Sequence, residues 1–247
     1  MDEKRYLGRI GVEIDRGPKT EFDRLVELQR RHLYTVPFTN WFVLENDGTT
    51  MQSSTVVPRI VSGGGGLCYD LNGSFAWLLE RLGFDVTFVS ARPVRDDGSY
   101  GPAYDHLALL VDDHVVDVGF GAFARQPLPL GGTQRTDVSG TYRVFFDDDG
   151  YVVQKRAERD WEESYRFDTQ PRTAGEFEEM TVHHSTSPES PFTDELLVSI
   201  ATENGRKTLS GTTLTVTNGD TRERRDVQPG TVTDVLTDEF GLETRTM

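Results

Sequence analysis

The chain has 247 residues, 41 acidic and 26 basic side chains, and a formal net charge of −15 at pH 7. This charge argues against a nucleic-acid partner, because phosphate backbones are bound by clusters of lysine and arginine. A single cysteine excludes an internal disulfide framework. The N-terminus has no signal-peptide pattern, and no apolar run reaches about 18 residues, so we expect a cytoplasmic protein with no membrane contact.

The first third of the chain is predicted to be helical. Thr20 and Asp23 form an N-cap pattern before one apolar helical face. A glycine run over residues 63–66 precedes Cys68, and apolar residues then recur at helical spacing until Gly83. The apolar face of the first helix consists of Phe22, Leu25, Val26 and Leu33, and that of the second consists of Leu71, Phe75, Leu78, Leu79 and Leu82.

Strands are predicted to dominate from residue 86 to about residue 167. Asp112-Asp113 and residues 148–150 are turn signals between alternating runs, which indicates two hairpins. After a short helix over 174–180, further strands and a last helix over 231–240 are expected. The predicted strands cover residues 86–89, 107–111, 115–118, 142–146, 151–154, 196–200 and 212–216.

Cys68 is the candidate nucleophile. It lies at the start of the predicted helix, where the positive end of the helix dipole favours the thiolate, and the thiolate is the nucleophilic form of cysteine. The alternative is a small buried hydrophobic residue, which is the commoner role of a lone cysteine.

His106 and Asp117 are the candidate partners of this thiol. In a hairpin closed at Asp112-Asp113 they lie near the open end of adjacent strands, where cross-strand Cβ atoms are about 4.5–5.5 Å apart. A histidine base oriented by a carboxylate is what a thiol nucleophile needs. The alternative for Asp117 is a plain strand-end cap.

These residues carry a family resemblance. Gly-Gly-Leu-Cys-Tyr-Asp-Leu-Asn, Asp-His-Leu and Asp-Val-Gly-Phe-Gly resemble the three catalytic segments of the arylamine N-acetyltransferases. Three further segments match in the same order, and together the matches run from about residue 6 to about residue 211. The matching segments are residues 36–40, 65–72, 82–86, 105–107, 117–121 and 185–193.

The resemblance implies an α+β, papain-like cysteine acyltransferase with a Cys68-His106-Asp117 triad. It implies an N-terminal helical bundle that carries the nucleophile (residues 1–85), a central antiparallel β-barrel that carries the histidine and the aspartate (86–185), and a C-terminal α/β lid (186–247). It also implies ping-pong transfer of an acetyl group from the co-substrate acetyl-CoA to a small arylamine or hydrazine. No Cys/His cluster has zinc spacing, so no metal is expected.

Two aromatic residues match family positions that line the acceptor pocket. The resemblance implies that Phe38 and Phe120 bind the substrate, whereas ordinary core packing is the alternative for both. The chain departs from the family pattern at Gly64, where the family has arginine, and at Thr39, where it has glutamate. Joint loss of both charges suggests that a structural ion pair has been removed. The loop between His106 and Asp117 is also shorter than is typical.

Two other classes of function stay open. A papain-like amide synthase or hydrolase would use the same triad with another acyl donor or with another acceptor. A non-catalytic binding module on the same fold would not need all three triad residues.

Overall fold

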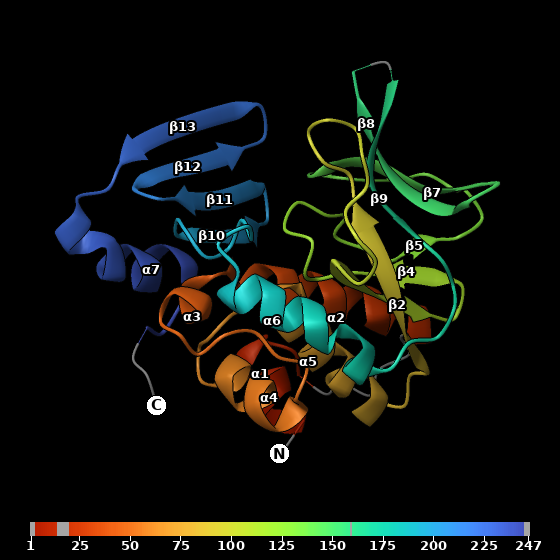
Figure 1. Ribbon diagram of the computed structural model, residues 1–247, viewed down its shortest axis with the longest axis horizontal. Helices are drawn as coiled ribbons and strands as arrows, with labels where there is room; N and C mark the ends of the chain where they lie inside the picture. Colours follow the sequence, from red (N-terminus) through yellow and green to blue (C-terminus); the bar gives the residue numbers. More distant parts are fainter. Residues whose placement is uncertain (1–2, 14–19, 159, 245–247) are drawn as a thin grey trace.

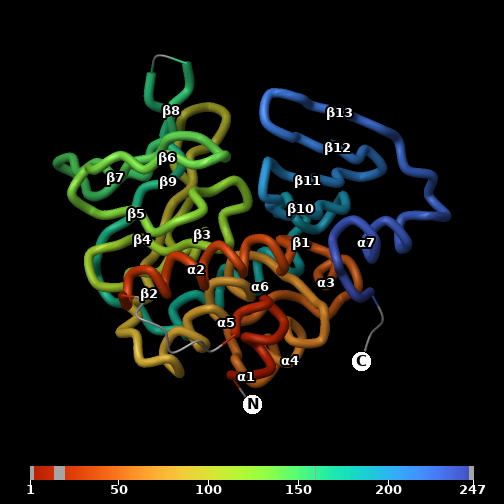
Figure 2. The backbone as a smooth tube through the Cα atoms, turned by 180° about the vertical axis from the view of Figure 1, so that it is seen from behind, coloured from red at the N-terminus to blue at the C-terminus, as the bar shows by residue number. Residues whose placement is uncertain are grey.

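The computed structural model describes residues 3–13, 20–158 and 160–244 of the chain. Helices form the base of the molecule, and two antiparallel sheets stand side by side above them (Figure 1 and Figure 2). This arrangement confirms the α+β class. The N-terminal helices are α1 (Glu3–Arg9), α2 (Glu21–Thr35), α3 (Trp41–Leu44), α4 (Ser53–Val61) and α5 (Cys68–Arg81).

The predicted helix starts and stops are confirmed in α2 and α5. Thr20 caps α2, and its hydroxyl accepts a hydrogen bond from the Asp23 backbone N–H at 3.1 Å while the Asp23 carboxylate accepts from the Thr20 N–H. Gly83 follows α5 with φ of 95°, a left-handed conformation that glycine adopts without steric cost.

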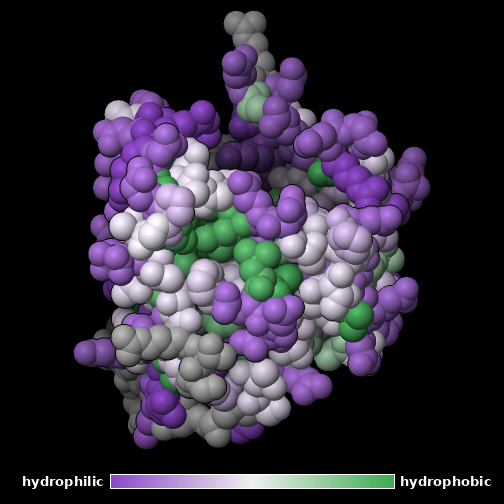
Figure 3. Space-filling model, turned by 60° about the vertical axis from the view of Figure 1, so that its left-hand side comes forward, coloured by the Kyte–Doolittle hydropathy of each residue, from purple (hydrophilic) through white to green (hydrophobic). Residues whose placement is uncertain are grey.

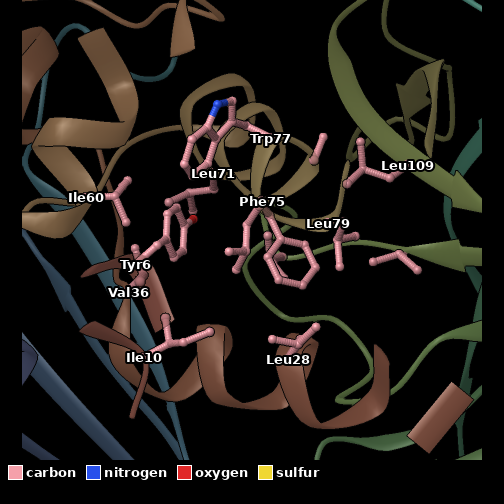
Figure 4. Packing of buried hydrophobic residues seen from close by; sticks show 14 of the residues in the cluster. Tyr6, Ile10, Leu28, Val36, Ile60, Leu71, Phe75, Trp77, Leu79 and Leu109 are labelled. Atoms are coloured by element: carbon pink, nitrogen blue, oxygen red, sulfur yellow. The ribbon is translucent and has the colours of Figure 1, made fainter. Parts of the chain in front are cut away.

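The helices pack around one apolar core, in which α5 is central. Side chains from α1, α2 and α4 point toward Leu71, Phe75 and Leu79 of α5, and Leu109 closes the core from the barrel sheet (Figure 4). Since both faces of α5 are covered, nearly its whole length is buried. Such enclosure fixes the first residue of α5, Cys68, on a rigid element.

The larger sheet is an eight-stranded, wholly antiparallel barrel that is not fully closed. Its strand order is β5-β4-β3-β2-β9-β8-β7-β6, and β5 also lies against β7. It encloses a second core that includes Tyr142 and Tyr165. The strands are β2 (Val86–Pro93), β3 (His106–Val111), β4 (His114–Val116), β5 (Leu128–Pro129), β6 (Arg135–Asp137), β7 (Gly140–Asp147), β8 (Gly150–Ala157) and β9 (Asp160–Phe167).

The smaller sheet has the order β1-β10-β11-β12-β13, and α7 covers one of its faces. Its edge strand β1 comes from the N-terminal part of the chain, and Phe38 also bridges to Gly66 in the loop before Cys68. The sheet is therefore continuous with the loop that carries Cys68. Its strands are β1 (Phe38–Thr39), β10 (Leu197–Thr202), β11 (Gly205–Ser210), β12 (Thr213–Asn218) and β13 (Thr221–Asp226), and α7 is Val232–Phe240.

The structure has strands β9, β11 and β13, which the sequence did not predict, and three further details differ from the prediction. The strand predicted over 115–118 ends at Val116, because the Asp117 carboxylate binds the next backbone N–H groups and turns the chain away. The helix predicted over 174–180 is a 3-10 turn, η1 (Ala174–Phe177), that leads into α6 (Glu178–Thr186). The last helix is preceded by η2 (Pro229–Thr231). The domain boundaries after residues 85 and 185 stay predictions.

The side of the molecule that carries α7 and β13 is largely hydrophilic, with one apolar area near its centre (Figure 3). Among the described residues, no helix has the length and apolar character to cross a bilayer.

Candidate active site

The candidate site is built on the N-terminus of α5. Cys68 is the first residue of this helix and has a relative exposure of 6%. The helix start is held by Asp70, whose carboxylate accepts a hydrogen bond from the Leu67 backbone N–H at 3.0 Å. The thiol thus lies at the positive end of a rigid, capped helix, as the sequence predicted.

His106 and Asp117 meet across the β3–β4 hairpin. Val111 pairs with His114, so the chain turns at Asp112-Asp113 as predicted. His106 Nε2 lies 2.7 Å from Asp117 Oδ2, and both residues are buried.

The second carboxylate oxygen of Asp117 is fixed as well. Oδ1 accepts hydrogen bonds from Gly119 N at 2.8 Å, from Phe120 N at 3.1 Å and from Asn72 Nδ2 at 2.9 Å. With these three donors and His106 around it, the carboxylate cannot rotate without losing several bonds.

Gly119 brings this hairpin end into contact with the nucleophile helix. A Cβ on Gly119 would lie 2.7 Å from the Cα of Cys68 and 2.8 Å from Asn72 Nδ2. Because the Cys68 Cα is backbone and Asn72 Nδ2 is held by two hydrogen bonds, neither neighbour can move aside, and only glycine fits here. The backbone after Asp117 is therefore packed directly on Cys68.

The environment of His106 favours its protonated form. Burial is the largest influence and lowers the pKa of His106, but the charge and hydrogen bond of Asp117 and the contact with the Cys68 thiol together raise this pKa to about 10. At neutral pH the ring is then an imidazolium between a carboxylate and a thiol. Such a cation stabilises a neighbouring thiolate.

Sequence reasoning assigned no role to Asn72 or Tyr69. Asn72 Nδ2 donates to Asp117 Oδ1 and to Leu107 O, and its Oδ1 accepts from Val118 N at 2.9 Å. It lies four residues after Cys68, hence on the same helix face, which is the signal that could have identified it. The Tyr69 hydroxyl donates to Tyr104 O at 2.8 Å and to Asp105 O at 3.1 Å, which fixes the backbone before His106.

The two predicted substrate-binding aromatics lie in different places. Phe120 packs edge-on against the His106 ring, with ring centroids 5.1 Å apart, and against Tyr165 at 4.9 Å. Phe38 lies on β1 beside Gly66 and packs against Phe192 at 5.9 Å. Phe120 is thus at the histidine itself, whereas Phe38 flanks the loop before Cys68.

Arg59 occupies the space that Gly64 leaves free. A Cβ on Gly64 would lie 2.7 Å from Arg59 Cγ. The Arg59 guanidinium lies 3.2 Å from Asp70 Oδ1 and 4.5 Å from the centre of the Phe42 ring. Thr39 accepts a hydrogen bond from the Trp41 N–H through Oγ1. Arg59 and Asp70 therefore form a buried ion pair beside the two positions that depart from the family pattern, and residue 64 takes no part in it.

A second buried histidine supports the segment before His106. His184 Nε2 lies 2.9 Å from Asp105 Oδ1, and its Nδ1 lies 3.0 Å from Ser190 Oγ. Ser190 Oγ also accepts from Phe192 N at 3.2 Å, and Ser190 is buried. This Asp-His-Ser chain clamps the loop after α6 to the residue next to His106, which is a structural use of these three types.

Within residues 3–13, 20–158 and 160–244, no group of three or more histidine, cysteine or acidic side chains has the geometry of a metal site. A cysteine at the start of a buried helix, packed on a histidine–aspartate pair, is the arrangement found in cysteine-dependent acyl-transfer enzymes.

Comparison with known proteins identifies the family. The profile of an N-acetyltransferase family matches residues 21–246. The chain is similar to an arylamine N-acetyltransferase of Mycolicibacterium smegmatis, with 31% identity over 98% of this chain and 92% of that protein. It is also similar to the proansamycin X synthase of Amycolatopsis mediterranei (strain S699), with 31% identity over 73% of this chain and 72% of that protein.

The fold agrees with the sequence matches. The structure of the Mycobacterium marinum arylamine N-acetyltransferase in complex with CoA superposes with a TM-score of 0.88 and 27% identity, over 98% of this chain and 93% of that chain. The chain belongs to the arylamine N-acetyltransferase family, whose members are acyltransferase enzymes.

Proposed function

We propose that this protein transfers an acetyl group from acetyl-CoA to an arylamine or hydrazine by a ping-pong mechanism, through a thioester on Cys68. The observation that carries the proposal is the buried His106–Asp117 pair, 2.7 Å apart, packed beside Cys68 at the start of α5. The bound CoA of the M. marinum relative supports the donor. A reduced thiol suits a cytoplasmic location.

In the first half-reaction, the Cys68 thiolate attacks the carbonyl carbon of acetyl-CoA. The new carbon–sulfur bond gives a tetrahedral intermediate, which collapses as the bond to the CoA sulfur breaks. The departing CoA thiolate takes the proton from the His106 imidazolium and leaves as the thiol. The products are acetyl-Cys68, neutral His106 and free CoA.

In the second half-reaction, the amine attacks the carbonyl carbon of acetyl-Cys68. His106, now neutral, accepts the proton that the amine loses, and the carbon–sulfur bond breaks to release the Cys68 thiolate. The amide leaves, and the imidazolium–thiolate pair is restored. Asp117 keeps Nε2 of His106 protonated throughout, so the other ring nitrogen is the one that exchanges the proton.

Phe120 and Phe38 position the acceptor amine. Phe120 packs on the His106 ring, so an aromatic amine stacked against Phe120 has its nitrogen close to the histidine. Phe38 lies on β1, next to the loop before Cys68. We assign both to the acceptor pocket.

Steady-state kinetics test the proposal. Initial rates at several fixed concentrations of acetyl-CoA and of an arylamine or hydrazine are expected to give parallel double-reciprocal plots. Intersecting plots would mean direct transfer in a ternary complex. No transfer with any amine would refute the assignment.

A second candidate is acyl transfer from another donor by the same residues. The similarity to proansamycin X synthase favours it. A screen of acetyl-, propionyl- and malonyl-CoA with one amine separates the two, since the first candidate predicts the highest kcat/KM for acetyl-CoA.

A further inference from the structure

The backbone that leads into His106 is strained. Tyr104, two residues before the histidine, has φ of 65°, a left-handed conformation that a bulky side chain rarely adopts. Strained backbone persists only where the surrounding contacts hold it, and it is concentrated at active sites. The other non-glycine residues with positive φ in the described ranges do not lie within two residues of the triad; they are Asn46, Asp112 and Glu158.

Tyr104 is held by three different elements. Its N–H donates to Ser90 Oγ on β2 at 2.7 Å, and its carbonyl accepts from the Tyr69 hydroxyl on α5 at 2.8 Å. Its ring packs edge-on against Phe177 of η1, with ring centroids 5.2 Å apart. These contacts fix the ring and both peptide groups of Tyr104.

The side chain of the next residue, Asp105, is held by α6. Its Oδ1 accepts a hydrogen bond from His184 Nε2 at 2.9 Å, since a carboxylate can only accept. His184 Nδ1 lies 3.0 Å from Ser190 Oγ, and His184 and Ser190 are both buried. Gly101 leaves room for the other carboxylate oxygen, because a Cβ there would collide with Asp105 Oδ2. A relaxation of the Tyr104 backbone would therefore swing the Asp105 carboxylate away from His184.

His106 depends on this segment for its own position. It is the first residue of β3 and pairs with Ala91, so the strand ladder continues only on its C-terminal side. On its N-terminal side the chain passes directly into the strained segment. A change in the backbone there would move the imidazole relative to both Asp117 and Cys68, and a misplacement of about 1 Å is enough to slow proton transfer strongly.

We propose that His184 is a positioning residue of the acyl transfer. Its bond to Asp105 holds the Tyr104 backbone in its strained conformation, and this conformation keeps His106 aimed at Cys68. This role rests on the proposed function, since it assumes that Cys68 and His106 carry out the transfer. It differs from a merely structural clamp, because loss of the bond lowers turnover in a protein that remains folded.

Two amide variants isolate the bond to Asp105. In His184→Gln the amide nitrogen reaches about as far as Nε2 and can still donate to Asp105. In His184→Asn the shorter amide stays near the place of Nδ1, so the contact with Ser190 can be kept but the bond to Asp105 is lost. His183→Asn is the matched control, because the bonds to Asp105 and Ser190 come from His184 and not from its neighbour on α6. Melting temperatures check that each protein is folded at the assay temperature.

In His184→Asn, kcat for acetyl transfer to an arylamine is expected to fall about 10- to 100-fold, as for loss of a hydrogen bond to a charged group. Both KM values should stay within about twofold, because His106 serves both half-reactions and substrate binding is untouched. His184→Gln should recover most of the loss, and His183→Asn should match the wild type.

Asp105→Ala removes the same bond from the other side and should lower kcat to a similar extent, so the test stands even if His184→Asn does not fold. Wild-type kcat in either variant, a loss confined to KM, or an equal loss in His183→Asn would overturn the proposal.

The strain itself is tested at Tyr104. Tyr104→Gly and Tyr104→Ala both remove the ring, but only alanine has a Cβ that opposes the left-handed conformation. In the His184→Asn background, kcat should therefore be about 5- to 30-fold higher with Tyr104→Gly than with Tyr104→Ala. In the wild-type background, where Asp105 is still held, the difference should be smaller. Equal kcat values for the two substitutions in the His184→Asn background would overturn the link between His184 and the strained backbone.

Alkylation of Cys68 by iodoacetamide keeps this role apart from the proposed function, because it needs the neighbouring imidazolium but no acyl donor. If the wild type acetylates no amine but His184→Asn slows alkylation at neutral pH, the proposed reaction fails and the positioning role stands. If amines are acetylated and His184→Asn keeps both the wild-type kcat and the wild-type alkylation rate, the positioning role fails and the reaction stands.

Discussion

Asp117→Asn separates catalysis from folding at this site. In the wild type, one oxygen of Asp117 faces His106 and the other accepts three hydrogen bonds. The amide can keep its oxygen on those three donors, which places its NH₂ group against His106 Nε2. That nitrogen must then accept, so the proton moves to the nitrogen that serves Cys68.

The size of the effect follows from the environment of His106. Asp117 is the strongest of the influences that raise the pKa of His106 to about 10, and burial, which lowers it, is the largest influence of all. Without the carboxylate the ring is neutral at pH 7, and the thiolate loses its counter-ion. We expect kcat/KM to fall about 10³- to 10⁴-fold, which corresponds to about 4–5.5 kcal/mol of barrier. The three retained hydrogen bonds limit the loss of stability to about 1–3 kcal/mol.

The assay measures kcat/KM for acetyl-CoA and an arylamine alongside the melting temperature. Asp96→Asn, on an exposed turn, is the matched control and should leave both unchanged. Wild-type activity in Asp117→Asn would remove Asp117 from the mechanism. A loss of activity no larger than expected from the unfolded fraction would reduce Asp117 to a structural role.

Three further predictions use other parts of the chain. Iodoacetamide should alkylate Cys68 more slowly at neutral pH in the His106→Gln variant than in the wild type, because the variant lacks the imidazolium beside the thiol; equal rates would contradict the ion pair. Gly64→Arg should lower the melting temperature, because a Cβ there would lie 2.7 Å from the Arg59 backbone oxygen as well as from Arg59 Cγ, and adding Arg59→Ala should not restore it, because the backbone clash stays and Asp70 loses its partner; a wild-type melting temperature in either variant would contradict this packing. Burial lowers the pKa of His32 to about 3, below its unfolded value near 6.5, so the unfolded state binds more protons as pH falls from 6.5. Stability should therefore fall by about 1.4 kcal/mol per pH unit through this range, and a slope unchanged by His32→Gln would refute the assignment.

The sequence predicted the parts of the fold that depend on local patterns. The capped helix after Thr20, the buried helix that begins at Cys68 and the hairpin closed at Asp112-Asp113 all follow from spacing and turn chemistry, and the structure confirms them. The meeting of His106 and Asp117 could be expected because a hairpin places the ends of its two strands together.

The features that the sequence did not predict depend on contacts between segments that are distant along the chain. Strand β13 has polar side chains on both of its faces, and Leu209 is the one large apolar residue of β11, so no alternating pattern marks these strands. The role of Arg59 beside Gly64 is set by packing and has no local signal. The bond from His184 to Asp105 joins residues 79 apart and is likewise invisible to periodicity.

The central claim is that Cys68 carries the acetyl group between donor and acceptor. Intact-mass analysis after mixing with acetyl-CoA, without an amine, tests it most directly. We expect the wild type to gain the mass of one acetyl group, to lose it when an arylamine is added, and the Cys68→Ala variant to gain nothing. A stable adduct in Cys68→Ala, or amine acetylation by that variant at the wild-type rate, would contradict the account.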